Sequence, residues 1–365
     1  MTTIKEKIEK ALLEGVGDEE WNRLTIEWDA LKEKSESKTK VLGSGKKGCV
    51  FSPPAPSTGL KYQSEKYVMK VTDNEESSHE LNVASVLRCI DPRGEFLAYP
   101  IPRAFIVDIS EIPAPCLPFV TMSSRGGLIL PYAGTPMSNS KQVADFYVGL
   151  LPALDRLKMV GVAHLDIHPP NILVDDQKKP RIIDFGTAII NDYYNKLLDW
   201  ISLLDSPLVL VSIFNSLALA VVVVKFLLVV DGSTTEKDLK EKLLKEYGPY
   251  LKWFQNEDLL DKWMALDIKT FWSTVLEPNF FKLDLFRLSM LAFQNTDITG
   301  DLKTWVVRCL NPDITKVPSV EEVILGLRDS KMLSEKDILT LKSQVEFHGA
   351  YDKLFSTELN APPLE

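Results

Sequence analysis

The chain has 365 residues and a mass of 41.1 kDa, which is enough for a two-lobed enzyme or for two small domains. Hydrophobic residues make up 45% and charged residues 25% of the sequence, a globular composition that excludes a disordered or collagen-like chain. With 42 Lys and Arg against 51 Asp and Glu, the net charge of −9 argues against broad, charge-driven binding of nucleic acid.

The spacing of the cysteines indicates the redox state of the compartment in which the protein folds. They are far apart in the sequence and include no C-x-x-C pair, which predicts neither a zinc site nor a disulfide framework. We therefore expect a reducing, cytoplasmic compartment. The N-terminal residues alternate charged and apolar side chains without a continuous apolar segment, so we expect no secretory signal. The cysteines are Cys49, Cys89, Cys116 and Cys309.

In chain order, the hydrophobic pattern predicts four segments. Residues 1–40 have helical periodicity and form an N-terminal extension. Residues 41–134 are rich in strand patterns and contain one helix, which predicts a small sheet. Residues 135–330 are mostly helical, and residues 331–365 form a C-terminal helix and tail. The expected fold class is therefore α+β.

A glycine-rich stretch lies between the first two predicted strands. Gly43, Gly45 and Gly48 precede Val50 in the pattern G-x-G-x-x-G-x-V. Glycine lets backbone N–H groups approach a phosphate because no Cβ stands in the way. A hairpin turn without a ligand would give the same pattern. A dinucleotide-binding fold is disfavoured because a strand, not a helix, follows.

Lys70 ends an apolar strand pattern, where a charged ammonium group needs an anionic partner. The next helix supplies one, and Asp73 with Glu76 predicts its N-terminal cap. By helical periodicity, Glu80 shares the apolar face of this helix, whereas Glu76 lies one turn earlier and remains an alternative partner. Lone lysines and glutamates are usually solvated, so only the combination favours a site.

The strongest chemical signal is H-x-D-x-x-x-x-N followed by D-F-G. It holds Asp166, Asn171 and Asp184 beside two short predicted strands, which would bring three oxygen-bearing side chains to the mouth of one hairpin. Oxygen ligands are what Mg²⁺ and a phosphate-bound nucleotide need. Such a string rarely arises by chance, which favours a phosphate-handling site over a structural turn.

The order of these motifs resembles that of the protein kinases. The resemblance covers residues 41–186 and implies a two-lobed α+β fold, with a β-rich N-lobe and an α-rich C-lobe. It also implies ATP and Mg²⁺ as cofactors, and Ser or Thr hydroxyls of protein substrates as acceptors. A nucleic-acid partner is not expected.

The resemblance further implies roles for the residues near the phosphates. Lys70, paired with Glu80, would contact the α- and β-phosphates, and Asp166 would orient the acceptor hydroxyl and take its proton. Asn171 and Asp184 would hold Mg²⁺. The residues that cover the phosphates would be Gly43, Ser44, Gly45 and Gly48.

By the same resemblance, the adenine would bind at the segment that joins the lobes. Leu130 would be the gatekeeper, the carbonyl of Pro131 would face the adenine amino group, and Ala133 would offer its backbone N–H. Proline is tolerable there because only its carbonyl is required. The side chains expected to enclose the base are Val50, Val68 and Leu173.

Two departures from the kinase pattern affect regulation and the acceptor. Leu165 replaces the Arg that pairs with a phosphorylated activation loop in many kinases, which argues against regulation by loop phosphorylation. His168 replaces the Lys that reaches the γ-phosphate, and it resembles the small-molecule kinases of the aminoglycoside-phosphotransferase type. We therefore keep two alternatives: a small-molecule kinase, and a pseudokinase that binds a nucleotide or a partner without catalysis.

Residues 187–280 are longer than an ordinary activation segment and contain a strongly apolar run within residues 208–230. The resemblance makes Asp284 the candidate anchor of the catalytic loop, with Asp199 as its rival. If Asp284 is the anchor, both flanks of the apolar run belong to one lobe, so a single membrane crossing would destroy the site. We expect a buried helix, and membrane contact is the disfavoured alternative.

A narrower resemblance is to the serine/threonine kinases encoded by large nucleocytoplasmic DNA viruses. It rests on the string SGKKGCVFSPP, on Ile90-Asp91-Pro92 and on the irregular activation region. It implies a viral protein of the host cytoplasm or the virion.

Overall fold

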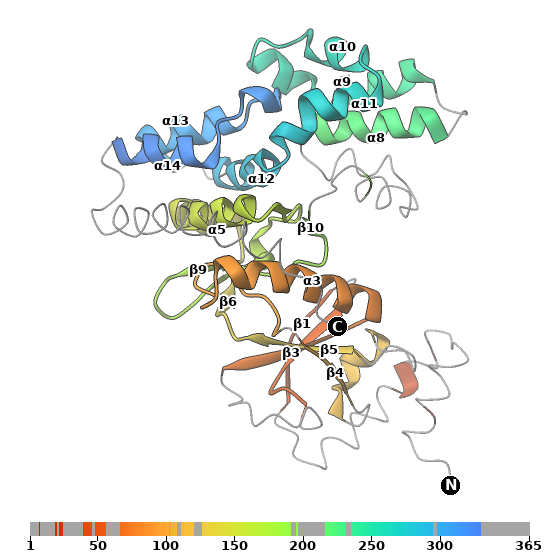
Figure 1. Ribbon diagram of the computed structural model, residues 1–365, viewed down its shortest axis with the longest axis vertical. Coiled ribbons are helices and arrows are strands. Elements are labelled where there is room, and N and C mark those ends of the chain that lie inside the picture. Colours follow the sequence, from red (N-terminus) through yellow and green to blue (C-terminus); the bar gives the residue numbers. More distant parts are fainter. Residues whose placement is uncertain are drawn as a thin grey trace, which may run out of the picture. The chain divides into compact units, whose positions relative to one another are not determined.

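The computed structural model of the chain contains two compact units, one of residues 1–138 and 156–191, the other of residues 139–155 and 192–365. The first unit holds the large sheet and the second is helical (Figure 1), so the predicted two-lobed α+β fold is confirmed. The structure describes residues 7, 19, 22–24, 39–45, 48–55, 66–101, 103–107, 111–119, 126–190, 195, 216–230, 235–294 and 298–329.

A five-stranded antiparallel sheet forms the centre of the first unit (Figure 1), with the strand order β1-β2-β3-β5-β4. The middle strand β3 pairs with β5 along its whole length, and all of its residues but the first are buried. The sheet thus places Lys70 inside the unit rather than at its surface. The strands span Lys40–Gly45 (β1), Gly48–Ser52 (β2), Tyr67–Thr72 (β3), Ala104–Ile106 (β4) and Gly126–Pro131 (β5).

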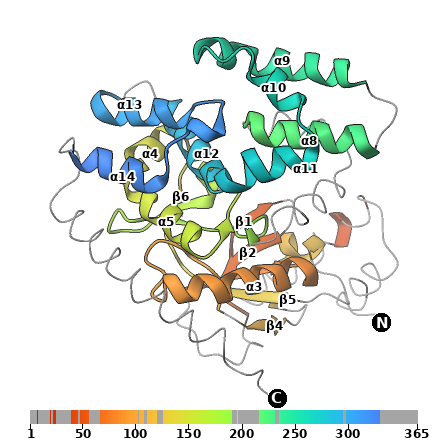
Figure 2. The same ribbon diagram turned by 45° about the horizontal axis from the view of Figure 1, so that its top comes forward.

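The helix α3 (Asn74–Ile90) packs beside β4 and β5, as both ribbon views show (Figures 1 and 2). It begins as the sequence predicts, because the Asp73 carboxylate accepts a hydrogen bond from the Glu76 backbone N–H at 2.7 Å. The helix buries Glu80 on the same face as Val83, Ala84 and Leu87. The amphipathic pattern therefore carries a carboxylate into the core.

A disulfide between Cys49 and Cys116 corrects the expectation that the cysteines stay unpaired. Cys49 lies in β2, and Cys116 lies in the 3-10 helix η3 (Ala114–Phe119), which packs beside β2. Both residues are fully buried. They are 67 residues apart, so the spacing along the chain gave no sign that the fold brings them together. Cys89 and Cys309 are free thiols.

Short strands of the first unit carry the H-x-D-x-x-x-x-N and D-F-G motifs. β8 pairs with β9 in an antiparallel hairpin, to which β6 adds a third strand, and β7 pairs with β10. Asn171 precedes β8 and Asp184 follows β9, so both lie at one end of this hairpin, as the sequence predicts. The strands span Thr135–Pro136 (β6), Val162–Ala163 (β7), Ile172–Val174 (β8), Pro180–Ile182 (β9) and Ile189–Ile190 (β10).

The second unit consists of helices. α12 packs against α4 and α13, and it also contacts the start of α5, where the buried hydroxyl of Tyr147 lies 2.8 Å from the hydroxyl of Ser289. The helices span Ser140–Asp145 (α4), Tyr147–Met159 (α5), Leu217–Val230 (α8), Glu236–Trp253 (α9), Leu259–Met264 (α10), Ile268–Phe271 (α11), Lys282–Phe293 (α12), Gly300–Cys309 (α13) and Val320–Asp329 (α14).

The helix α8 accounts for the described part of the apolar run. Residues 217–224 are at most 3% exposed, so this part is a buried helix, as the sequence predicts. Lys225, the charged residue of α8, is also buried and donates hydrogen bonds to the carbonyls of Met264 and Leu266. Among the described helices, none is long and apolar enough to cross a membrane.

Several predictions fall outside the described residues. They concern most of the N-terminal extension 1–40, Asp199, residues 208–215 and the tail 331–365. Asp284 is buried in α12, and its role as an anchor stays a prediction, as do the predicted domain borders.

Candidate active site

The strand β3 brings the ammonium group of Lys70 to two carboxylates. Its Nζ contacts Oε1 of Glu80 on α3 and lies 2.9 Å from Oδ1 of Asp184. The side chains of Lys70 and Glu80 are 8% and 1% exposed, whereas that of Asp184 is 44% exposed. Glu80 is therefore buried, whereas the side chain of Asp184 is exposed enough for a ligand to contact it.

Burial and charge act in opposite directions on this cluster. Burial lowers the pKa of Lys70, but the charges of Glu80 and Asp184 outweigh burial and raise it, so the amine stays protonated. Burial raises the pKa of Asp184, but the charge of Lys70 outweighs that effect and holds this pKa below its usual value. For Glu80, burial dominates over the attraction of Lys70 and raises the pKa to about 7.

Glu80, rather than Glu76, is the helix residue that contacts Lys70. Glu76 lies against the D-F-G motif instead: a Cβ added to Gly186 would stand 1.8 Å from Oε1 of Glu76. Only glycine leaves this space empty, and Gly186 thereby lets α3 approach the D-F-G segment closely.

His164 links the H-x-D-x-x-x-x-N segment to the D-F-G segment. Its ring is fully buried; Nε2 lies 2.9 Å from the carbonyl oxygen of Ile183, and Nδ1 lies 3.2 Å from the backbone nitrogen of Asp166. A carbonyl accepts and a backbone N–H donates, so the ring carries its proton on Nε2. The ring also packs edge-on against Phe185, with centroids 5.0 Å apart. These contacts fix Asp166 relative to Asp184.

Two side chains surround the carboxylate of Asp166. The Asn171 amide nitrogen donates to its Oδ2 at 3.2 Å and to its backbone oxygen at 3.1 Å, and His168 Nε2 lies 3.4 Å from Oδ2. Burial raises the pKa of Asp166, but the hydrogen bond and charge of His168 outweigh burial and lower it. Asp166 is therefore ionised at neutral pH and able to accept a proton.

Asn171 and Asp184 offer oxygen atoms at the same end of the β8–β9 hairpin. The amide oxygen of Asn171 accepts no hydrogen bond from any residue that the structure describes, and Asp184 is partly exposed. Mg²⁺ usually takes one or two carboxylates together with substrate phosphates and water, so this pair fits that ion. Within the described ranges, no three Cys, His, Asp or Glu side chains gather to hold a metal alone.

The glycine hairpin is formed by β1 and β2, in which Gly45 pairs with Gly48. A Cβ added to Gly48 would stand 2.9 Å from a backbone carbonyl of β3 and 3.2 Å from Cε of Lys70, so packing alone requires glycine there. Gly43 has open space around it, and Ser44 is exposed. The two lysines at the tip lie outside the described residues, and the contact with phosphates stays a prediction.

The predicted adenine-binding residues lie on adjoining strands. In β5, Leu130 pairs with Val68 of β3, and Pro131 ends the strand. Ala133 is 2% exposed. Val50 pairs with Lys70 across β2 and β3, and Leu173 lies in β8. Their enclosure of a base stays a prediction.

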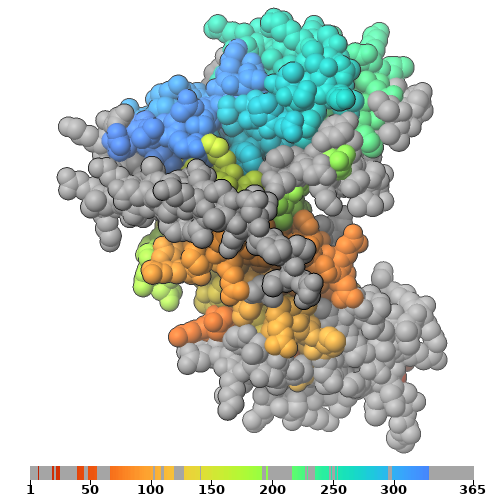
Figure 3. Space-filling view, viewed as in Figure 1, coloured from red at the N-terminus to blue at the C-terminus, as the bar shows by residue number. Residues whose placement is uncertain are grey.

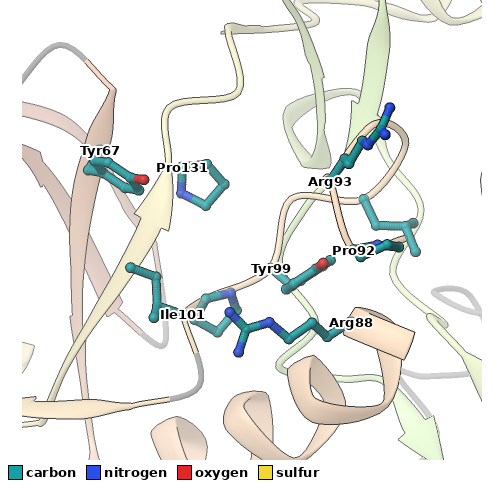
Figure 4. A pocket seen from close by; sticks show the side chains of 10 residues that line it. Tyr67, Arg88, Pro92, Arg93, Tyr99, Ile101 and Pro131 are labelled. Carbon is teal, nitrogen blue, oxygen red and sulfur yellow. The ribbon is translucent and has the colours of Figure 1, made fainter. Parts of the chain in front are cut away.

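A hollow of about 160 Å³ lies at the C-terminal end of α3 (Figure 4). Its lining includes Arg88 and Tyr99, with Tyr67 and Pro131 at the ends of β3 and β5. None of the polar residues described above lines it, so we do not assign it to the nucleotide.

Sequence reasoning missed two residues that support the site. The His79 ring nitrogen Nε2 lies 2.8 Å from the carbonyl oxygen of Ala188, and the Thr187 hydroxyl donates to the carbonyl of His164 at 3.1 Å. No motif marks His79 or Thr187. Their positions beside Glu80 and the D-F-G motif were the only available signal.

Comparison with known proteins places these motifs in a wider context. No protein-family model matches this chain. It is 27% identical to the serine/threonine-protein kinase ksg1 of Schizosaccharomyces pombe over 157 residues, which are 41% of this chain and 24% of that protein. It is 24% identical to the CBL-interacting serine/threonine-protein kinase 15 of Arabidopsis thaliana over 159 residues, which are 42% of this chain and 34% of that protein.

A shorter match is to the serine/threonine-protein kinase PKH1 of Saccharomyces cerevisiae, which is 40% identical over 65 residues, 18% of this chain and 8% of that protein. The matches therefore span about a third or less of these relatives. At this low identity, the chain is a distant relative of serine/threonine protein kinases.

Proposed function

We propose that this chain is an ATP- and Mg²⁺-dependent kinase that transfers the γ-phosphate to Ser or Thr hydroxyls of proteins. The observation that carries the proposal is the cluster in which Lys70 contacts both Glu80 and Asp184. Burying a charged pair costs free energy, so a chain that only needed to fold would gain little from it. The distant similarity to serine/threonine kinases supports the same reaction.

The proposed roles follow from the charges of the site. The protonated Lys70 would bind phosphate oxygens of ATP, and Glu80 would hold its ammonium group in place. The ionised Asp166 would accept a hydrogen bond from the acceptor hydroxyl, align it with the γ-phosphate and take its proton. Bound by Asn171 and Asp184, Mg²⁺ would supply positive charge to the phosphates. Catalysis would come mainly from placement and electrostatics.

His168 favours a second candidate, a kinase of small molecules. It lies 3.4 Å from Asp166, at a position where protein kinases usually carry Lys. A third candidate is a nucleotide-binding pseudokinase. The presence of Lys70, Asp166, Asn171 and Asp184 argues against it, because a scaffold has no chemical need for all four.

An acceptor panel separates these candidates. The purified chain is incubated with Mg-ATP and, in parallel, with casein-type proteins, aminoglycosides and sugars, and phosphate transfer is measured. We expect phosphoserine or phosphothreonine on proteins, and loss of this product in Asp166→Asn, which keeps the size of the side chain. Transfer to aminoglycosides or sugars alone would support the second candidate. Nucleotide binding without any transfer would support the third.

We also propose that the chain is a viral protein of the host cytoplasm or the virion. This proposal rests on the string SGKKGCVFSPP and the irregular activation region. Membrane contact through residues 208–230 remains the disfavoured alternative.

A further inference from the structure

His79 makes a contact that the proposed reaction does not use. It precedes Glu80 on α3 and is half-buried, and its Nε2 lies 2.8 Å from the carbonyl oxygen of Ala188. A carbonyl oxygen only accepts, so the ring N–H is the donor. The two residues are 109 positions apart, which makes this bond a link between α3 and the segment that follows D-F-G.

The segment that receives this bond is itself held in place. Ala188 is 1% exposed, and its backbone N–H donates to the carbonyl of Phe185 at 3.1 Å. Thr187 donates to the carbonyl of His164 at 3.1 Å, and Ile189 pairs with Ala163 between β10 and β7. His79 therefore binds to a fixed point rather than to a loose loop.

These contacts form a closed chain of neighbours that begins and ends at Lys70. Lys70 contacts Glu80; the adjacent His79 contacts Ala188; and the chain leads back over a few residues to Asp184, which also contacts Lys70. The adjacent residues His79 and Glu80 thus bind α3 to two different elements, the segment after D-F-G and the strand β3.

Leu165 follows His164, whose carbonyl accepts the hydrogen bond from Thr187. The side chain of Leu165 is apolar and cannot pair with a phosphate, unlike the Arg expected there from the resemblance to kinases. We propose that His79 is a positioning residue, which fastens α3 to the D-F-G segment by a hydrogen bond from its ring N–H and holds Glu80 in contact with Lys70 without phosphorylation of the chain. This inference rests on the proposed kinase activity.

The test compares three variants of the full chain. His79→Leu removes the donor, whereas His79→Gln keeps an N–H donor at similar reach. Ser78→Ala is the matched control, since Ser78 lies on the outer face of α3, which reaches the surface in Figure 3. We expect kcat to fall about tenfold in His79→Leu, the equivalent of one hydrogen bond, with a smaller change in KM for ATP. His79→Gln should recover most of kcat, and Ser78→Ala should match the wild type.

A second arm tests the independence from phosphorylation. Phosphatase treatment of the wild-type chain, followed by removal of the phosphatase, should leave the initial rate unchanged. Loss of that rate, a wild-type kcat in His79→Leu, or a His79→Gln variant as slow as His79→Leu would each overturn the proposal.

Amide hydrogen exchange separates this proposal from the proposed function. His79→Leu should raise exchange in α3 and in residues 185–190, whether or not the chain transfers phosphate. A wild-type chain without any transfer would overturn the kinase assignment. Unchanged exchange in His79→Leu would overturn the role of His79.

Discussion

Glu80 is a carboxyl group of the site with a pKa raised to near neutral pH. Burial raises its pKa from 4.5 to about 7, so the folded chain binds this proton more tightly than the unfolded chain does. Between about pH 4.5 and about pH 7, Glu80 loses its proton in the unfolded chain before it does so in the folded chain. A rise in pH over this range therefore lowers the free energy of unfolding. Protonation, in turn, removes the negative charge that holds Lys70.

We predict opposite trends of activity and stability for this reason. As the pH falls from about 8 to about 6, kcat should fall, whereas the contribution of Glu80 to the free energy of unfolding should rise. Transfer rates and urea unfolding of the wild type and Glu80→Gln would measure both trends. The Gln variant should be slower and should lack both pH-dependent contributions. A wild-type kcat that stays flat over this range would contradict the role of Glu80.

Gly186 and Glu76 form a second testable pair at the residue scale. The side chain of Gly186→Ala would collide with the Glu76 carboxylate, which must then leave its place. We predict a loss of stability of about 1–3 kcal/mol, measured by urea unfolding. Because the obstacle is the end of one side chain, Gly186→Ala combined with Glu76→Ala should cost less than the sum of the single changes. Additive costs would show that the two residues do not meet.

At the scale of elements, the disulfide joins β2 to η3 across 67 residues. By restricting the unfolded chain, it should stabilise the fold by about 2–4 kcal/mol. Cys116→Ser should lose this amount in urea unfolding without reductant, whereas Cys89→Ser, at an exposed free thiol, should not. Titration of the unfolded wild-type chain should find two of its four cysteines as thiols. Four thiols would contradict the bridge.

The elements also show what sequence reasoning can reach. The cap at Asp73 and the buried stripe through Glu80 are local patterns, and they predicted α3 correctly. The partner of Cys49 and the contact of His79 with Ala188 depend on segments 67 and 109 positions away. No periodicity or motif encodes such pairs, because they arise only once the sheet and the β8–β9 hairpin are assembled.

For the whole molecule, the main finding is that the polar site residues belong to one compact unit. The β8–β9 hairpin is connected to the rest of the unit that holds the large sheet by backbone hydrogen bonds of Ile182 with Phe96 and Ala98. Residues 156–191, which carry the H-x-D-x-x-x-x-N and D-F-G motifs, group with the sheet by their contacts. The motifs predicted which residues come together, but a change of periodicity does not reveal which segments share a core.

The measurement that tests the central claim most directly is the rate of phosphate transfer from Mg-ATP by Asp184→Asn. Asp184 has a φ of 63°, a region that Asn tolerates well, so this variant should keep its fold. We predict a fall in turnover of at least about 100-fold, because Asn lacks the charge that binds Mg²⁺ and faces Lys70. A folded Asp184→Asn variant with wild-type turnover would contradict the account.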